Sequence, residues 1–223
     1  MTPPPSAAER VAALLRRELL SGRHQPGARL KEEELSERFR TSRYTVRSAL
    51  QSLVAAGMLD HRANRGASVP LLTRQRVDEL SDHREVLEVG ALRLALRRGG
   101  DLRGVAEATR ALERLTVDAP WSEVVVTHQR IHHELVASAG NDKLLQAYVQ
   151  CEDELLYVVS TVRPDYTAAR LAELHVRLLA GLRRGREDAV RALEDDLRTG
   201  RDAVLESLGA NRPAHVPAAA APR

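Results

Sequence analysis

Apolar residues recur at helical spacing along almost the whole chain after Pro70, and this period limits the folds that the chain can adopt. The periodic stretches are separated by residues typical of helix ends, in the sequences RRGGD, DAPW, AGN, RPD and RRGRED. Helices joined by such short connections pack antiparallel to their neighbours. We therefore predict an antiparallel all-helical bundle of six to seven helices over residues 74–208, with segments near 74–99, 101–116, 120–139, 141–162, 165–184 and 186–208.

Residues 6–70 show a different order of elements. A first amphipathic helix is predicted to end at Leu20, and the sequence KEEELSERF predicts a short second helix. Ser42 is placed to cap a third helix that stops at Gly57. The sequence MLDHRANRGASV then carries turn residues between two short extended pieces, which predicts a hairpin. Three helices and a hairpin are the plan of a winged helix-turn-helix domain, so the predicted fold is mainly α.

Composition agrees with this fold and excludes several classes of protein. Aromatic residues make up only 3% of the chain, which favours helices packed through aliphatic side chains over a β-sandwich. The single cysteine, Cys151, excludes an internal disulfide framework and fits a reducing cytoplasm. Because no apolar run is long enough to span a membrane, we expect a soluble cytoplasmic protein. The Pro- and Ala-rich residues 209–223 are expected to form a disordered tail.

Charge is divided unevenly along the chain. Residues 1–70 hold 12 Lys and Arg against 7 Asp and Glu, whereas residues 71–223 hold 22 against 24. A basic first third points to a module that binds a polyanion. In a helix-turn-helix the N-terminal residues of the second helix enter the major groove of DNA. The candidate DNA contacts are Arg43, Tyr44, Thr45 and Arg47 on that helix, and Arg62, Arg65 and Gly66 on the wing.

The alternative interpretation of these residues is a solvated basic face on a small helical domain. Charge alone would favour it, but the helix order, the Ser42 cap and the wing together favour DNA binding. Arginine can bond guanine through two donors, and threonine and tyrosine hydroxyls suit phosphates or base edges.

The stretch RLKEEELSERFRTSRYTVRSALQSLVAAGMLDHRANRGASV resembles the DNA-binding domain of GntR-family bacterial transcription regulators. The family reads L-x-x-x-x-L-A, then V-S-R-x-x-V-R-x-A-L, then L-x-x-x-G-L and a basic wing ending R-G. Thr41 replaces the usual Val, and Tyr44 occupies a variable position. The resemblance covers nearly all of residues 8–70 and implies that Arg43, Thr45, Arg47 and the wing's Gly66 contact DNA.

Three later stretches resemble the helical effector domain of the FadR subfamily, the FCD domain: HREVLEVGALRLAL, HQRIHHELVASAGNDKL and LHVRLLAGLRRGREDAVRALEDDL. In many members an Asp and three His from these segments bind a divalent metal. In this chain the first and last ligand types are exchanged relative to that pattern. The resemblance implies zinc, nickel or manganese bound by His128, His132, His175 and Asp196.

Two other interpretations of this metal site remain open. Paired histidines one helical turn apart also occur by chance, so the exchanged set could be a decayed site. Asp195 could take the place of Asp196 if the helix register is shifted by one residue. His133 is expected to point away from the pair His128 and His132 and to be solvated.

Arg84 and the aromatic residues of the bundle each allow two interpretations. Arg84 could form an i, i+4 ion pair with Glu88, or, by the family resemblance, could hold a carboxylate effector near the metal. The aromatic side chains could line a pocket, although bundle core is the expected role. They are Trp121, Tyr148, Tyr157 and Tyr166.

The sequence thus predicts a ligand-responsive bacterial transcriptional regulator, expected to be a repressor. Its predicted partners are a palindromic double-stranded DNA operator, a second copy of the chain in a homodimer, and a small organic acid. One alternative is an architectural DNA-binding dimer without an effector. The other is a metal-dependent hydrolase, which the absence of an H-E-x-x-H or a nucleophile motif argues against, so we expect no enzyme activity.

Overall fold

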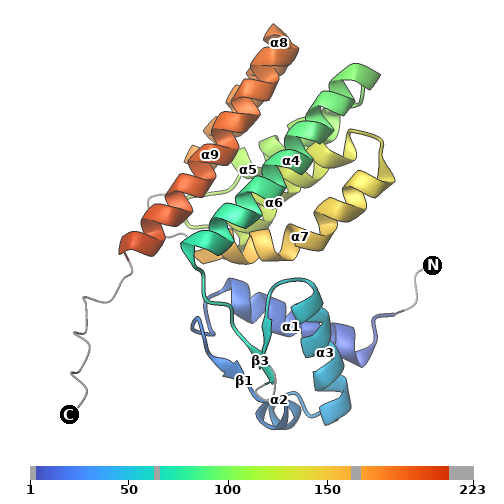
Figure 1. The fold of residues 1–223 in the computed structure, drawn as a ribbon, viewed down its shortest axis with the longest axis vertical. Helices are drawn as coiled ribbons and strands as arrows, with labels where there is room; N and C mark the ends of the chain where they lie inside the picture. Colours follow the sequence, from blue (N-terminus) through green and yellow to red (C-terminus); the bar gives the residue numbers. More distant parts are fainter. Residues whose placement is uncertain (1–3, 63–65, 162–166, 211–223) are drawn as a thin grey trace, which may run out of the picture.

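The structure, a computed structural model, describes residues 4–62, 66–161 and 167–210. These residues form two lobes (Figure 1). The smaller N-terminal lobe combines three helices with a three-stranded sheet, and the larger lobe is a bundle of helices. The mainly α fold predicted from the sequence, a winged helix-turn-helix followed by a helical bundle, is confirmed.

Helix α1 (Ala7–Leu20) starts at a reciprocal cap. The Ser6 hydroxyl accepts a hydrogen bond from the Glu9 backbone N–H, and the Glu9 carboxylate accepts one from the Ser6 N–H. One face of the helix is then buried through residues such as Val11 and Leu15.

Helices α2 (Glu32–Arg38) and α3 (Arg43–Ala55) form the helix-turn-helix. Arg40 lies in the turn between them with a positive φ of 49°, a left-handed conformation that reverses the chain within a few residues. Ser42 then caps α3, because its hydroxyl accepts from the Thr45 N–H at 3.1 Å. The predicted Ser42 cap is therefore present.

The sheet of the N-terminal lobe contains the predicted hairpin and one further strand. Strands β2 (Asp60–Arg62) and β3 (Gly66–Ser68) pair antiparallel, and β1 (Arg29–Leu30) pairs with the other edge of β3. The strand order is β1-β3-β2. Strand β1 was not predicted, because two residues are too short to show a period.

Six helices of the described residues make up the bundle, at positions close to the predicted segments. The last of them continues through positions 209 and 210, so these two residues are helical and not part of a tail, while residues 211–223 lie outside the described residues. The bounds are α4 (Arg74–Arg98), α5 (Arg103–Glu113), α6 (Trp121–Ala137), α7 (Asp142–Thr161), α8 (Ala168–Arg184) and α9 (Arg186–Ala210).

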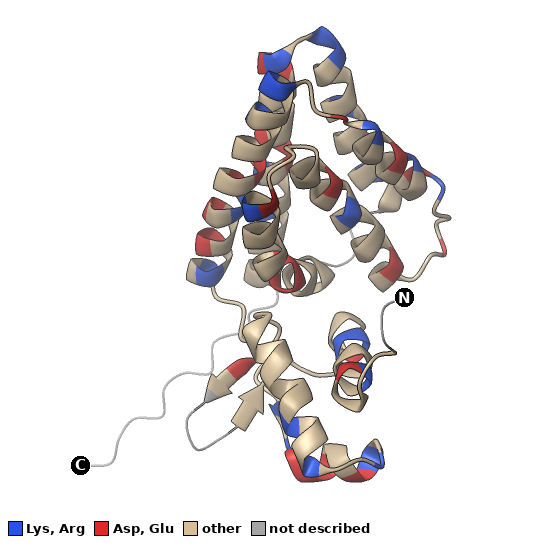
Figure 2. Cartoon of the chain, turned by 90° about the vertical axis from the view of Figure 1, so that its right-hand side faces the viewer, with Lys and Arg blue, Asp and Glu red and all other residues tan. Residues whose placement is uncertain are grey.

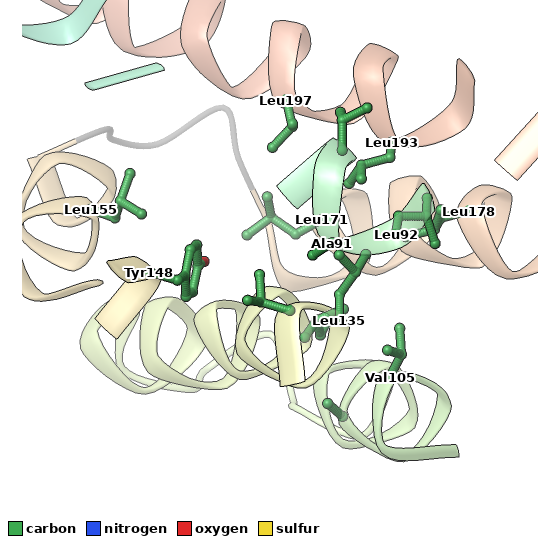
Figure 3. Packing of buried hydrophobic residues seen from close by; sticks show 14 of the residues in the cluster. Ala91, Leu92, Val105, Leu135, Tyr148, Leu155, Leu171, Leu178, Leu193 and Leu197 are labelled. Carbon is green, nitrogen blue, oxygen red and sulfur yellow. The ribbon is translucent and has the colours of Figure 1, made fainter. Parts of the chain in front are cut away.

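The core of the bundle is built from aliphatic side chains of all six helices. Figure 3 shows Leu155, Leu171 and Leu197 reaching inward from α7, α8 and α9. A second buried cluster fills the N-terminal lobe, and it includes Val125 from α6 and Leu156 and Tyr157 from α7. The two lobes therefore share buried apolar contacts across their boundary.

Polar contacts reinforce this boundary. Arg76, in the first turn of α4, donates to Asp60 of β2 at 2.8 Å, to Glu154 of α7 at 2.7 Å and to the backbone oxygen of Gly57 at 3.1 Å. The Tyr157 hydroxyl donates to the backbone oxygen of Pro70 at 3.1 Å. Helix α7 is thus held against the wing on one side and belongs to the bundle on the other.

Among the described helices, none is both long and apolar enough to cross a membrane.

Candidate metal centre and DNA-binding surface

Three histidines and one aspartate meet in the interior of the bundle. His128 and His132 lie one turn apart on α6, His175 comes from α8, and Asp196 comes from α9. All four side chains are buried, and nitrogen atoms of the three histidines lie within 4.8 Å of one another. We refer to these four residues as the His–Asp cluster.

The distances within the His–Asp cluster are those of groups arranged around a common point. His132 Nε2 lies 3.2 Å from His128 Nε2 and 3.1 Å from His175 Nε2. Asp196 Oδ2 lies 3.5 Å from His175 Nε2 and 3.8 Å from His132 Nε2. Zinc binds such atoms at about 2.0–2.2 Å, which places the ligand atoms of a tetrahedral site about 3.3–3.6 Å apart. The observed separations bracket this range.

The tautomers of two rings support the same interpretation. His132 Nδ1 lies 2.8 Å from a Glu88 carboxylate oxygen, and His175 Nδ1 lies 2.7 Å from the backbone oxygen of Leu171. The backbone oxygen and the Glu88 carboxylate both act as acceptors, so each Nδ1 carries a proton, and the neutral form of each ring directs an Nε2 lone pair inward. Two lone pairs facing each other at 3.1 Å repel one another unless a proton or a cation lies between them. The donor set therefore fits a divalent metal.

Protonation of the His128 and His132 rings is disfavoured. Burial, and then the charges of neighbouring groups, hold the pKa of His128 and His132 well below the ordinary value of 6.5. A neutral imidazole is the form that binds a metal, so His128 and His132 are in the required state at neutral pH.

Glu88 belongs to the candidate metal centre, although its sequence position indicated only an ion pair with Arg84. The fully buried Glu88 accepts from Arg84 Nε at 2.6 Å with one oxygen and contacts His132 Nδ1 with the other. Burial raises the pKa of Glu88, and the adjacent Arg84 charge opposes that rise. A carboxylate behind a ligating histidine fixes its ring and increases its basicity. The i, i+4 spacing of Arg84 and Glu88 was visible in the sequence, but the approach of α6 to α4 was not.

Neighbours of the His–Asp cluster settle two of the alternatives left open by the sequence. Asp195 is exposed and pairs with Arg198 on the surface, so Asp196 is the aspartate that faces the histidines. His133 does point away from its neighbour His132, but it is only half-exposed and its Nδ1 lies 3.2 Å from Glu152. His133 is therefore only partly solvated, because α7 covers that side of α6.

A cavity opens beside the His–Asp cluster, with His128 and Asp196 in its wall. Arg84 also lines this bundle cavity, and its Nη2 is buried without a hydrogen-bond partner among the described residues. His128 Nδ1 and Trp121 Nε1 are two further buried donors or acceptors without a partner there. Buried polar groups in proteins are nearly always hydrogen-bonded, so three polar atoms without a partner in one cavity indicate a site for a polar ligand.

The aromatic residues divide between cavity and core. Trp121 lines the bundle cavity, whereas Tyr148 is fully buried in the core and accepts from Gln129 at 2.7 Å. Tyr157 packs at the boundary between the lobes, and Tyr166 lies outside the described residues.

The proposed DNA contacts on α3 lie on the surface at the start of that helix. Tyr44 is 80% exposed, so its side chain is accessible to a ligand. Arg43 forms an ion pair with Glu33, and Arg47 forms one with Glu32 at 2.7 Å. Thr45 Oγ1 lies 2.9 Å from the Ser42 hydroxyl. Figure 2 shows the resulting mixture of acidic and basic residues at the end of the lobe farthest from the bundle.

The wing is described in part. Gly66 begins β3 with a φ of 73°, and a Cβ at this position would meet no atom within 4 Å. Its left-handed conformation favours glycine, and its open surroundings permit close approach of another molecule. The backbone of Arg62 lies in β2, while Arg65 lies outside the described residues.

Comparisons with known proteins match each lobe to a known protein family or domain. Residues 7–69 match the family described as bacterial regulatory proteins, gntR family, and residues 79–198 match the FCD domain. The FCD match alone covers more than half of the chain. The chain belongs to the GntR family and carries an FCD domain.

Relatives of this GntR-family protein are named as transcriptional regulators. The Nta operon transcriptional regulator of Aminobacter aminovorans is 27% identical over 166 residues, which are 74% of this chain and 78% of that protein. The regulator McbR of Escherichia coli K12 is 25% identical over 172 residues, with the same two shares. A GntR regulator structure from Rhodococcus sp. RHA1 has 28% identity and a TM-score of 0.75, covering 93% of this chain and all of that one.

The protein is accordingly a transcriptional regulator with a GntR DNA-binding domain and an effector-binding FCD domain. The candidate DNA contacts fall within the gntR match, and the His–Asp cluster and Arg84 fall within the FCD match.

Proposed function

We propose that this regulator acts as a dimeric repressor whose operator affinity is controlled by a small carboxylate effector bound in the bundle cavity. His128, His132, His175 and Asp196 would hold a divalent transition metal: zinc, nickel or manganese. Such a metal would supply positive charge beside the cavity, which favours a carboxylate there. The observation that carries the proposal is the set of inward-facing histidine lone pairs beside the unpartnered Arg84 Nη2.

Arg84 is suited to a carboxylate even without the metal. Its Nε is held by Glu88, which fixes the guanidinium plane, while Nη2 is left over at the cavity wall. Burial lowers the pKa of Arg84, but the nearby groups, Glu88 first, outweigh burial and raise this pKa above its ordinary value, so the side chain is permanently charged. A fixed, buried guanidinium is a strong and directional partner for a carboxylate. Both interpretations of Arg84, ion pair and effector ligand, can therefore hold together.

DNA recognition is proposed to use Arg43, Tyr44, Thr45 and Arg47 from α3, and Arg62, Arg65 and Gly66 from the wing. In a dimer each copy would place its α3 in one half-site of a palindromic operator.

Helix α7 offers a physical route from effector to DNA. Leu155 and Val158 line the bundle cavity, whereas Leu156 and Tyr157, on the other side of the same helix, pack into the N-terminal lobe. A ligand that displaces the first pair moves the second. The effector can change operator affinity only by binding the two arrangements of the lobes with different affinity.

The test is elemental analysis of purified, untagged protein beside matched variants. His132→Ala and Asp196→Ala remove proposed ligands, while His133→Ala and Asp195→Ala alter their immediate neighbours, which face away from the cluster. We expect about one equivalent of transition metal in the wild type and in both controls, and loss of the metal in both ligand variants. Background metal in all five proteins would overturn the metal site.

The alternative function is an architectural DNA-binding dimer whose bundle has no effector. It predicts that operator affinity is the same with and without a chelator or organic acids. A response of operator affinity to either would exclude it.

A further inference from the structure

The bundle cavity is polar at one place and apolar elsewhere, and this division bears on the chemistry of the effector. Arg84, His128 and Asp196 supply polar groups close to the His–Asp cluster, together with the Trp121 Nε1, and the remaining polar lining residues are Ser81 and Arg201. The rest of the wall is mainly aliphatic and comes from four helices. Side chains of this wall include Val77 and Leu80 from α4, Leu155 and Val158 from α7, Leu174 from α8 and Val204 from α9.

Among the described residues, Arg84 Nη2 is the buried arginine nitrogen of this cavity that lacks a hydrogen-bond partner. Arg201 is the other arginine among its lining residues, but its Nε and Nη2 both donate to Asp78 Oδ1, at 2.9 and 2.7 Å. A first carboxylate of a ligand would meet Arg84 and the adjacent metal site. A second carboxylate would face mainly valine and leucine side chains, because Arg201 is already paired with Asp78 and Ser81 carries no charge, and burying an unpaired charge in such surroundings is very costly.

We propose that the effector is a monocarboxylic acid with an apolar tail, and that di- and tricarboxylic acids are excluded. The carboxylate meets Arg84, and the tail lies along the aliphatic wall. This inference rests on the proposed function, because it specifies the ligand of the same cavity. Ligand sites of this kind, apolar with a few polar groups that fix orientation, are common in proteins.

The direct test compares two acids of equal length. Hexanoate and adipate each have six carbons, and adipate differs only in carrying a second carboxylate in place of the terminal methyl group. Isothermal titration of the purified full-length protein should show hexanoate binding at least tenfold more tightly than adipate. In the series acetate, butyrate and hexanoate, affinity should rise by about fourfold per methylene group until the tail fills the cavity.

A variant locates the tail. Gly200 lines the cavity on α9, one turn beyond Asp196, and a Cβ placed there meets no atom within 4 Å. Gly200→Leu should therefore fold, and should weaken hexanoate at least tenfold while acetate binds as before. Gly90→Leu is the matched control, because Gly90 is an exposed helical glycine with equally open surroundings that does not line the cavity. It should leave both acids unchanged.

The outcomes separate this inference from the function on which it rests. Tighter binding of adipate or citrate than of hexanoate would overturn the proposal that the effector has an apolar tail, but it would still agree with a carboxylate effector. Unchanged hexanoate affinity in Gly200→Leu would overturn the placement of the tail. If the metal-containing protein binds none of these acids, the carboxylate effector itself is wrong.

Discussion

At the scale of single residues, the His–Asp cluster depends on the groups behind it. His132 and His175 present lone pairs to the interior only because Glu88 and the Leu171 carbonyl hold their Nδ1 protons. Of these two groups, only Glu88 can be changed by mutation without altering the backbone. It is also the residue that connects the histidines to Arg84, since one carboxylate contacts both.

Glu88→Gln tests this dependence. The amide keeps the size of the side chain but loses its charge, so His132 becomes a weaker ligand and its ring is less firmly oriented. We expect metal affinity to fall by about 10–100-fold, measured by competition with a chromogenic chelator. Glu85→Gln, an exposed change three residues earlier on α4, is the control and should bind metal as the wild type does. Equal metal affinities in the wild type and both variants would show that Glu88 does not support metal binding.

At the scale of elements, local signals predicted the helices better than the contacts between them. The Ser42 cap and the breaks between bundle helices depend on residues that are adjacent in the sequence, so their positions could be predicted. The proximity of His128 and His132 also follows from one helix. His175 and Asp196 joined them only through the family resemblance, because nothing local specifies how α8 and α9 pack on α6. The two-residue strand β1 and the Glu88–His132 contact depend on distant segments for the same reason.

The boundary helix α7 carries an element-scale prediction. Burial raises the pKa of Tyr157 to about 12 from an ordinary value of 10. The folded protein therefore keeps the Tyr157 proton where the unfolded chain loses it, so the stabilisation from this group is complete below pH 10 and disappears as the pH rises to 12.

Tyr157→Phe removes both the hydroxyl and this titration. At pH 8 the variant should be less stable than the wild type by about 1 kcal/mol, because the hydrogen bond to Pro70 is lost. Denaturant unfolding at increasing pH should show the wild type losing stability relative to the variant above pH 10, so that the gap closes and then reverses as the pH rises to 12. Tyr44→Phe, at an 80% exposed position, is the control and should follow the wild type throughout. A constant gap between wild type and Tyr157→Phe would contradict the assignment.

At the scale of the whole molecule, the two lobes should unfold together. The apolar cluster of the N-terminal lobe includes Val125, Leu156 and Tyr157 from the bundle, and Arg76 connects α4, α7 and the wing. Domains that share buried surface in this way lose stability when either unfolds.

Differential scanning calorimetry of the full-length protein should therefore show one cooperative transition. Arg76→Met breaks the polar connection and should broaden or split this transition, whereas Arg74→Met, exposed in the same turn of α4, should not. Two separate transitions in the wild type would show that the lobes are independent, and the route through α7 would then fail.

The ion pairs between α2 and α3 have a consequence for how the protein finds its operator in a genome. Arg43 and Arg47 form ion pairs with Glu33 and Glu32, so, with these arginines as the proposed DNA contacts, a phosphate of random DNA would displace a carboxylate before it gains an arginine. Non-specific sites outnumber the operator by about 10⁶ or more, and they offer nothing beyond that exchange. At the operator, base edges would add the contacts that make the exchange favourable. The carboxylates of α2 would thus shorten the residence time of the protein on non-specific DNA. More of the protein would then be unbound and able to reach the operator.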